Sequence, residues 1–160
     1  MKIVFNSSPL IFLTCLNFLD VFLESSDEFY VPHSVCVEID RKQDEASAFI
    51  NKTIAAEKIQ VRSSGLVSLV SRLSDRLGKG ESEAIALGLE IQTDYIILDN
   101  LAARREAMRL GLNVKGTLAV VKKLQADGKI AIDTLDALYQ RISEINFRVK
   151  RSVFDAIFED

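Results

Sequence analysis

Side chains that carry oxygen donors occur at four separate places in the chain. Asn6 precedes a pair of serines, Glu38 and Glu83 lie in helical patterns, and Asp99 with Asn100 follows an apolar run. Carboxylate and amide oxygens are the ligands that Mg²⁺ or Mn²⁺ prefers in proteins. A cation held by such oxygens could activate a water molecule and stabilise the leaving oxygen in phosphodiester cleavage. The residue types therefore predict a divalent-metal site, provided that the fold brings the four places together.

The elements that must position these side chains alternate between short apolar runs and helical patterns. Runs typical of buried strands occupy residues 2–6, 28–31 and 95–98 and the chain around Val114, with a minor candidate at 59–61. This alternation predicts an α/β fold, a three-layer α/β/α sandwich with a central parallel sheet, plus C-terminal helices. Ligands of such sheets bind outside the carboxyl ends of the strands, so we expect the oxygen donors to gather at that edge.

The length and composition fit one globular domain. The chain has 160 residues, of which 48% are hydrophobic and 27% are charged. We interpret residues 1–128 as the main domain and residues 129–160 as a helical tail that packs on it. No apolar run approaches the roughly 20 residues that span a bilayer, and no cleavage site follows the first apolar stretch, so we expect a cytoplasmic protein without membrane contact.

The N-terminal candidates also have a purely structural interpretation. Ser8 fits the N-cap of a helix that has Pro9 at its first position. The free helix N-terminus formed with Ser7 could instead hold a phosphate. Taken alone, Glu38 is also typical of a solvated helix residue.

The later candidates have structural interpretations as well. Glu83 could cap its own helix if Gly80 were the N-cap, and the spacing does not decide whether Glu81 or Glu83 faces inward. Residues 99–100 could form only a turn and a helix cap. A nucleotide-binding loop is disfavoured, because residues 78–80 (GKG) are too short for a phosphate-binding fingerprint.

A basic stretch follows the last candidate pair. Residues 101–123 contain six lysines and arginines, among them Arg104 and Arg105, against the single acid Glu106. These cations could be solvated helix faces, or they could contact a phosphate backbone. The net charge of −3 argues against binding nucleic acid through a uniformly basic surface, but it is compatible with a local basic patch.

Four segments together resemble the motifs of PIN domains. Residues 6–11 (NSSPLI) resemble the opening Asp-(Ser/Thr)-Ser and apolar helix, and residues 31–38 (VPHSVCVE) resemble "V-P-x-x-V-x-x-E". Residues 80–87 (GESEAIAL) are similar to "G-E-x-E-A-I-A-L", and residues 97–104 (ILDNLAAR) are similar to "L-D-D-x-x-A-R". The order and spacing resemble the prokaryotic predicted nucleic-acid-binding branch related to VapC-type toxins.

The resemblance implies a Rossmann-like sandwich, a divalent metal (Mg²⁺ or Mn²⁺), and ribonuclease activity on single-stranded RNA. For toxin relatives it also implies pairing with an antitoxin protein, and for this chain we predict a homodimer. By position, the acidic ligands of the family correspond to Asn6, Glu38, Glu83 and Asn100, with Asp99 beside the last. Glu38, Glu83 and Asp99 are therefore the expected catalytic residues. Ser8 matches the polar residue next to the first acidic position, and we expect Ser7, Ser8, Arg104 and Arg105 to contact phosphate or substrate.

The chain departs from the family pattern at two of the four acidic positions. Asn6 stands where the first Asp is expected, and Asn100 stands where the last one usually is. An Asn oxygen can ligate a metal but brings no negative charge. Two hypotheses follow: a metal-dependent ribonuclease of weakened activity, or a catalytically degenerate PIN scaffold that binds nucleic acid or protein.

Overall fold

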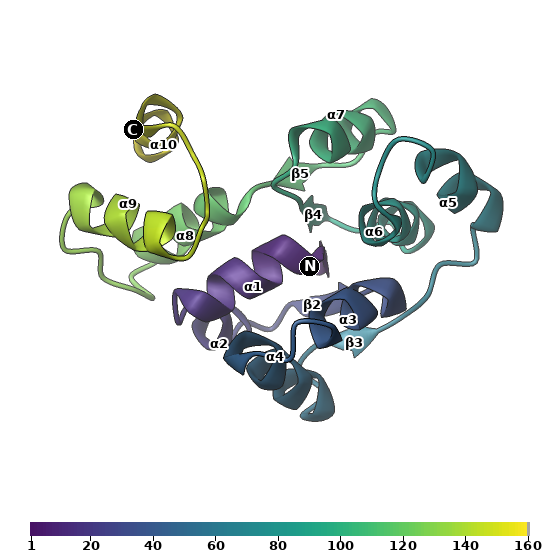
Figure 1. Cartoon of the computed structure of the whole chain (residues 1–160), viewed down its shortest axis with the longest axis horizontal. Coiled ribbons are helices and arrows are strands. Elements are labelled where there is room, and N and C mark those ends of the chain that lie inside the picture. Colours follow the sequence, from purple (N-terminus) through teal and green to yellow (C-terminus); the bar gives the residue numbers. More distant parts are fainter. Residues whose placement is uncertain (160) are drawn as a thin grey trace.

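A computed structural model describes residues 1–159 of the chain. Its centre is a five-stranded, fully parallel sheet with the strand order β3-β2-β1-β4-β5 (Figure 1). The α/β/α sandwich with a central parallel sheet that the sequence predicts is therefore confirmed. The strands are β1 (Lys2–Phe5), β2 (Glu28–Val31), β3 (Gln60–Val61), β4 (Tyr95–Ile97) and β5 (Val114–Lys115). The helices are α1 (Ser7–Cys15), α2 (Leu19–Phe22), α3 (His33–Asp40), α4 (Glu45–Ala55), α5 (Val67–Leu73), α6 (Lys79–Glu90), α7 (Leu101–Arg109), α8 (Thr117–Ala126), α9 (Leu135–Glu144) and α10 (Arg151–Phe158).

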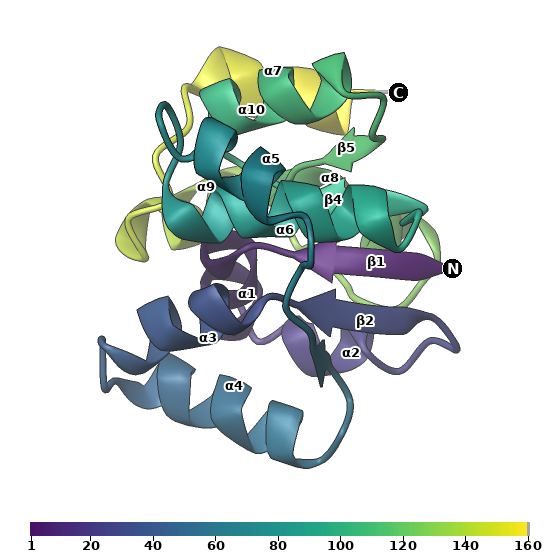
Figure 2. The ribbon, with the colours of Figure 1, turned by 90° about the vertical axis from the view of Figure 1, so that its right-hand side faces the viewer.

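The sheet is covered on both faces because its strands are apolar at successive positions. Ile3 and Phe5 of β1 point into a core formed with α1, α3, α8, α9 and α10. Val4, between them, points to the opposite face and packs with residues of α6 and α7. Figure 2 shows α5 and α6 lying across this second face of the sheet. The near-continuous apolar runs of β1 and β4 are thus the consequence of burial on both sides.

The strand order reverses between β1 and β4. From β1 the chain adds β2 and β3 on one side, and β4 and β5 then extend the sheet on the other side. The helices that leave β1 and β4, α1 and α7, pack on opposite faces of the sheet, and the carboxyl ends of these strands are where open α/β sheets bind their ligands. The segments that follow these strands carry Asn6 and Asp99, respectively.

The C-terminal helices pack onto the same core as the sheet. Phe147 stacks on Phe12 of α1, with ring centroids 4.2 Å apart. Phe154 of α10 is completely buried, lies 5.1 Å from the ring of Tyr139, and belongs to the core cluster of β1. Helix α10 also contacts α8, which begins directly after β5. The tail therefore contributes apolar surface to the core below the carboxyl edge.

Apolar residues recur with helical spacing over residues 41–57 and 66–77, and the helix observed in each segment is shorter than this spacing indicates. The pattern at residues 41–57 becomes α4 only from Glu45, because Asp44 and Ser47 form a reciprocal capping box that fixes the helix start. The pattern at 66–77 becomes α5, which ends at Leu73. Among the described residues, no helix has the length and hydropathy to cross a membrane.

Candidate functional site at the carboxyl edge

Asn6 lies at the end of the central strand, where β1 passes into α1. It is the N-cap of α1, so the expectation that Ser8 caps this helix is wrong. The helix can start two residues before Pro9, because the N–H groups of a first turn have no intrahelical acceptor and the missing N–H of proline therefore costs no hydrogen bond there. The Asn6 side chain is only 4% exposed, and its Oδ1 has no hydrogen-bond partner in residues 1–159. An unpaired buried amide oxygen is costly, so this atom is suited to accept a donor or a cation.

Glu38 is held next to Asn6 by the adjacent serine. The Ser7 hydroxyl donates a hydrogen bond of 3.0 Å to Glu38 Oε2 across the α1–α3 contact. The other oxygen, Oε1, lies only 2.1 Å from the place where a Cβ on Gly80 would be. Glu38 thus rests against the first turn of α6, where the helix dipole favours a carboxylate and only glycine leaves room for it.

The start of α6 separates the roles of its two glutamates. The N-cap is Gly78, and Glu81 closes the first turn by accepting the Gly78 N–H at 3.2 Å. Burial raises the pKa of the Glu81 carboxyl, an effect that the Gly78 N–H opposes and the negative charge of Glu38 reinforces. Glu83 is therefore not the capping residue, and its Oε2 accepts a 2.8 Å hydrogen bond from Ser34 of α3.

Glu38 and Glu83 line one cavity of about 350 Å³, which we call the acid cavity. Ser34 and Glu38 are four residues apart and so share one face of α3, and this face looks toward α6. Two cations, Arg41 and Lys79, also line the cavity. It thus combines two carboxylates with two positive side chains and has space for a polar ligand.

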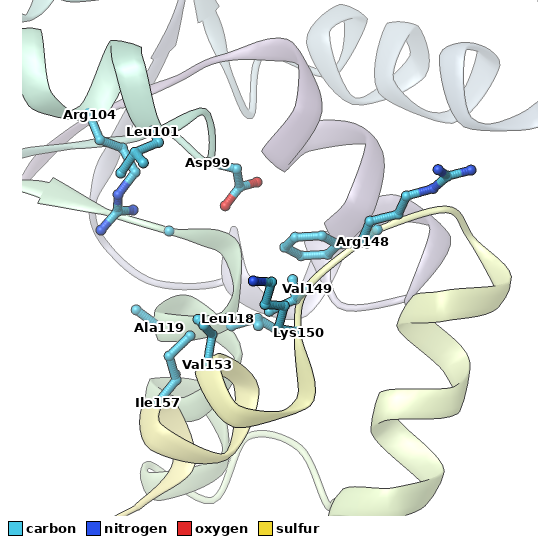
Figure 3. Close-up of a pocket in the computed structure, with 12 residues that line it drawn as sticks. Asp99, Leu101, Arg104, Leu118, Ala119, Arg148, Val149, Lys150, Val153 and Ile157 are labelled. Carbon is cyan, nitrogen blue, oxygen red and sulfur yellow. The ribbon is translucent and has the colours of Figure 1, made fainter.

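Asp99 points away from the acid cavity. Both of its carboxylate oxygens are bound by Thr117 at the start of α8, one by the N–H at 2.8 Å and one by the hydroxyl at 2.6 Å. Asp99 instead lines a second cavity, of about 520 Å³, together with Arg104 (Figure 3). Burial raises the pKa of the Asp99 carboxyl, while the bonds from Thr117 and the positive charge of Arg104 oppose that rise.

The raised pKa of Asp99 predicts a pH-dependent cost to stability. A carboxyl that titrates higher in the folded chain than in the unfolded chain makes folding less favourable as the pH rises past its ordinary value of 3.8. In Asp99→Asn this titration is absent, so the stability of the variant relative to wild type should increase from pH 3 to pH 7. Urea unfolding at both pH values measures this difference. Thr117→Val removes a bond that lowers the pKa and should steepen the pH dependence, whereas a flat or falling difference for Asp99→Asn contradicts the prediction.

The remaining predicted site residues have mixed placements. Asn100 is the N-cap of α7 and accepts the Ala103 N–H at 3.0 Å, so the predicted cap is confirmed there. Arg104 donates from Nη1 to the carbonyl of Leu98 at 2.8 Å. Arg105 is exposed and lines neither cavity, and Ser8 is half-buried with no side-chain hydrogen bond among residues 1–159.

The structure thus brings some of the predicted metal-binding side chains together and keeps others apart. Glu38 and Glu83 share a cavity, whereas Asp99 is turned to Thr117, and within residues 1–159 no three His, Cys, Asp or Glu side chains are grouped closely enough to hold a metal ion. Sequence reasoning missed Ser34 and Thr117, which orient two of the carboxylates. Their positions gave a signal: Ser34 lies one helical turn before Glu38, and Thr117 opens the helix after β5.

The strand order and the polar residues at the carboxyl ends of β1 and β4 define an α/β protein with a candidate ligand site at the topological switch point. A family model described as PIN domain matches residues 2–160, so the chain belongs to the PIN-domain family and has a nuclease-type fold. Among curated proteins, no match to the chain is found.

PIN domains generally use divalent metals, and within residues 1–159 the side chains do not fit a complete metal centre. Two carboxylates face the acid cavity. Both oxygens of Asp99, however, accept hydrogen bonds from Thr117, and the side-chain oxygen of Asn100 caps α7. Beside Ser7, which binds Glu38, the unpaired Oδ1 of Asn6 keeps a feature of a ligand position. It is neutral, so it supplies less attraction to a dication than the aspartate expected there.

Proposed function

We propose that this chain is a PIN-type protein that binds single-stranded RNA along the carboxyl edge of its sheet, and that its metal-dependent ribonuclease activity is weak. The observation that carries the proposal is that the acidic residues are divided between two cavities. Glu38 and Glu83 share the acid cavity with Arg41 and Lys79, whereas Asp99 is engaged by Thr117. Cations beside the cavity suit a phosphate backbone, and the missing carboxylates weaken the hold on a cation.

A stronger Mn²⁺-dependent ribonuclease is the second candidate. The buried, unpartnered Oδ1 of Asn6 favours it, since a metal or a water ligand would satisfy this oxygen. The relation to VapC-type toxins, the antitoxin partner and the homodimer stay predictions of the resemblance. In either candidate, Ser7 and Ser34 would act as positioning residues, because each holds one glutamate by a hydrogen bond.

The test separates RNA binding from RNA cleavage. Binding of a fluorescein-labelled single-stranded RNA is measured by anisotropy in EDTA, and cleavage of the same RNA is followed with Mn²⁺. We expect binding in EDTA and slow cleavage with Mn²⁺. Glu38→Gln and Glu83→Gln should each lower the cleavage rate about tenfold or more while leaving binding intact.

Glu24→Gln is the matched control, because Glu24 is exposed and precedes β2, at the opposite edge of the sheet. Cleavage that is equal in wild type and both glutamine variants would identify a contaminating nuclease. Rapid cleavage by wild type that both variants abolish would favour the second candidate. A wild-type protein that binds no single-stranded RNA would refute the proposal.

A further inference from the structure

The second cavity, which we call the tail pocket, lies between the start of α8 and the C-terminal segment 147–157. Its volume is about 520 Å³, within the range of small-molecule sites. Most of its wall is apolar, and this part includes Leu118, Ala119, Val149, Val153 and Ile157. Its polar side chains are Asp99, Arg104 and Lys150, with Arg148 at the rim. Figure 3 shows Lys150 reaching into the space that faces Asp99, while the guanidinium of Arg148 extends outward.

The chain holds the walls of the tail pocket in place. The hydroxyl of Tyr139 donates to the carbonyl of Val149, and the ring of Phe147 is stacked on Phe12. Leu118 is almost completely buried, whereas Val153 leaves 51% of its surface exposed. Covering an exposed apolar side chain with an apolar ligand group is favourable. Because the cavity is already formed, binding loses little conformational entropy.

The charge of the tail pocket favours an anion. Among residues 1–159, the side chains of Arg148 and Lys150 form no ion pair or hydrogen bond, and Arg104 donates to a carbonyl oxygen and acts on the Asp99 carboxylate through its charge. The single carboxylate, Asp99, is already satisfied by the N–H and hydroxyl of Thr117. Three cations against one hydrogen-bonded carboxylate complement a ligand that carries phosphate.

The tail pocket also lies on the path of a ligand that follows the carboxyl edge. Asp99 lies two residues after the end of β4, on one side of the switch point, and the α3 glutamate of the acid cavity comes after β2 on the other side. Asn6, at the end of β1, lies between these two strands. A strand of nucleic acid that crosses this edge would pass from one cavity to the other.

We propose that the tail pocket binds one nucleotide of the RNA, with the base against Val153 and Leu118 and the phosphate at Lys150 and Arg104. This inference rests on the proposed function, since it assigns a subsite to the same RNA. The apolar wall suits the face of an unstacked base, which single strands expose and duplexes hide. The C-terminal tail thereby becomes part of the binding surface, in addition to its place in the core.

The test measures binding of the labelled single-stranded RNA to the full chain in EDTA, over a series of salt concentrations. Lys150→Glu should weaken binding and lower the slope of log K against log salt by about 1. Val153→Trp fills the cavity without changing charge and should weaken binding about fivefold or more, because stacking of one base is lost. It should also weaken competition by the mononucleotides AMP and UMP.

Matched controls make the same changes elsewhere. Lys129→Glu reverses an exposed charge after α8, and Val67→Trp enlarges an exposed side chain on α5, so both should bind as wild type does. Thermal unfolding establishes that every variant is folded. Wild-type affinity in both pocket variants overturns the pocket assignment while RNA binding itself stands, whereas absence of RNA binding by wild type overturns the proposed function as well.

Discussion

Replacing Phe154 by alanine is expected to lower the free energy of unfolding by about 3–5 kcal/mol, the usual cost of removing a buried aromatic side chain. Phe154 is completely buried and lies between the rings of Tyr139 and Phe158. Its loss leaves a cavity where α10 meets the core. For a chain of this size the midpoint of thermal unfolding should fall by about 6–20 °C, which calorimetry measures.

The same variant tests the proposal that residues 129–160 are a tail of the main domain. Because Phe154 shares a core with β1, we expect one cooperative transition that moves to lower temperature. Val153→Ala is the control: the neighbouring side chain is half exposed, and its truncation should change stability by about 0.5 kcal/mol or less. A separate early transition in Phe154→Ala would show that the tail unfolds alone and would contradict the proposal.

Restoring aspartate at both Asn6 and Asn100 is expected to raise the affinity for Mn²⁺ about tenfold or more. Each change adds a negative charge at the carboxyl edge, and even at an effective dielectric constant of about 20 a nearby unit charge contributes several kcal/mol. Aspartate at 100 can still accept the Ala103 N–H, because Asp and Asn are equally good N-caps. Isothermal titration with Mn²⁺ measures the affinity.

The double variant should also be less stable without metal, by about 1–3 kcal/mol, because the position of Asn6 is buried and has no partner for a charge. Saturating Mn²⁺ should then raise its unfolding midpoint by about 5–10 °C, more than in wild type. The control Asn17→Asp/Gln125→Glu adds the same charge at exposed positions near the distant ends of α1 and α8. If wild type binds Mn²⁺ as tightly as the double aspartate variant, weak metal binding is not the reason for weak cleavage.

Much of the architecture was predictable because it depends on short-range pattern. Apolar strands such as 2–5 and 95–97 must be covered on both faces, and this requirement alone indicates a parallel sheet between two layers of helices. The ends of helices were harder to predict. Asn6 and Ser8 are both good N-cap residues, and which of them caps α1 depends on where β1 ends.

The candidate site shows the same division between local and tertiary information. The positions of Glu38 and Glu83 in helices that follow β2 and β3, and of Asp99 after β4, could be read from the sequence. Their orientations could not, because each is set by a hydroxyl that is distant along the chain or on another element: Ser7 for Glu38, Ser34 for Glu83, and Thr117 for Asp99. No periodicity encodes a hydrogen bond between residues that only the fold brings together.

The sequence by itself determined the PIN-type fold and the polar residues at its carboxyl edge, and the motif resemblance predicts that Asn6 and Asn100 stand at acidic positions of the family. The fold and the edge residues follow from residue types and from the spacing of apolar residues, which are local properties of the chain. Only the tertiary structure decided that the carboxylates divide between two cavities, because Thr117 at the start of α8 donates to both oxygens of Asp99. Packing of α10 against α8 likewise created the tail pocket, through contacts between segments that are far apart in sequence.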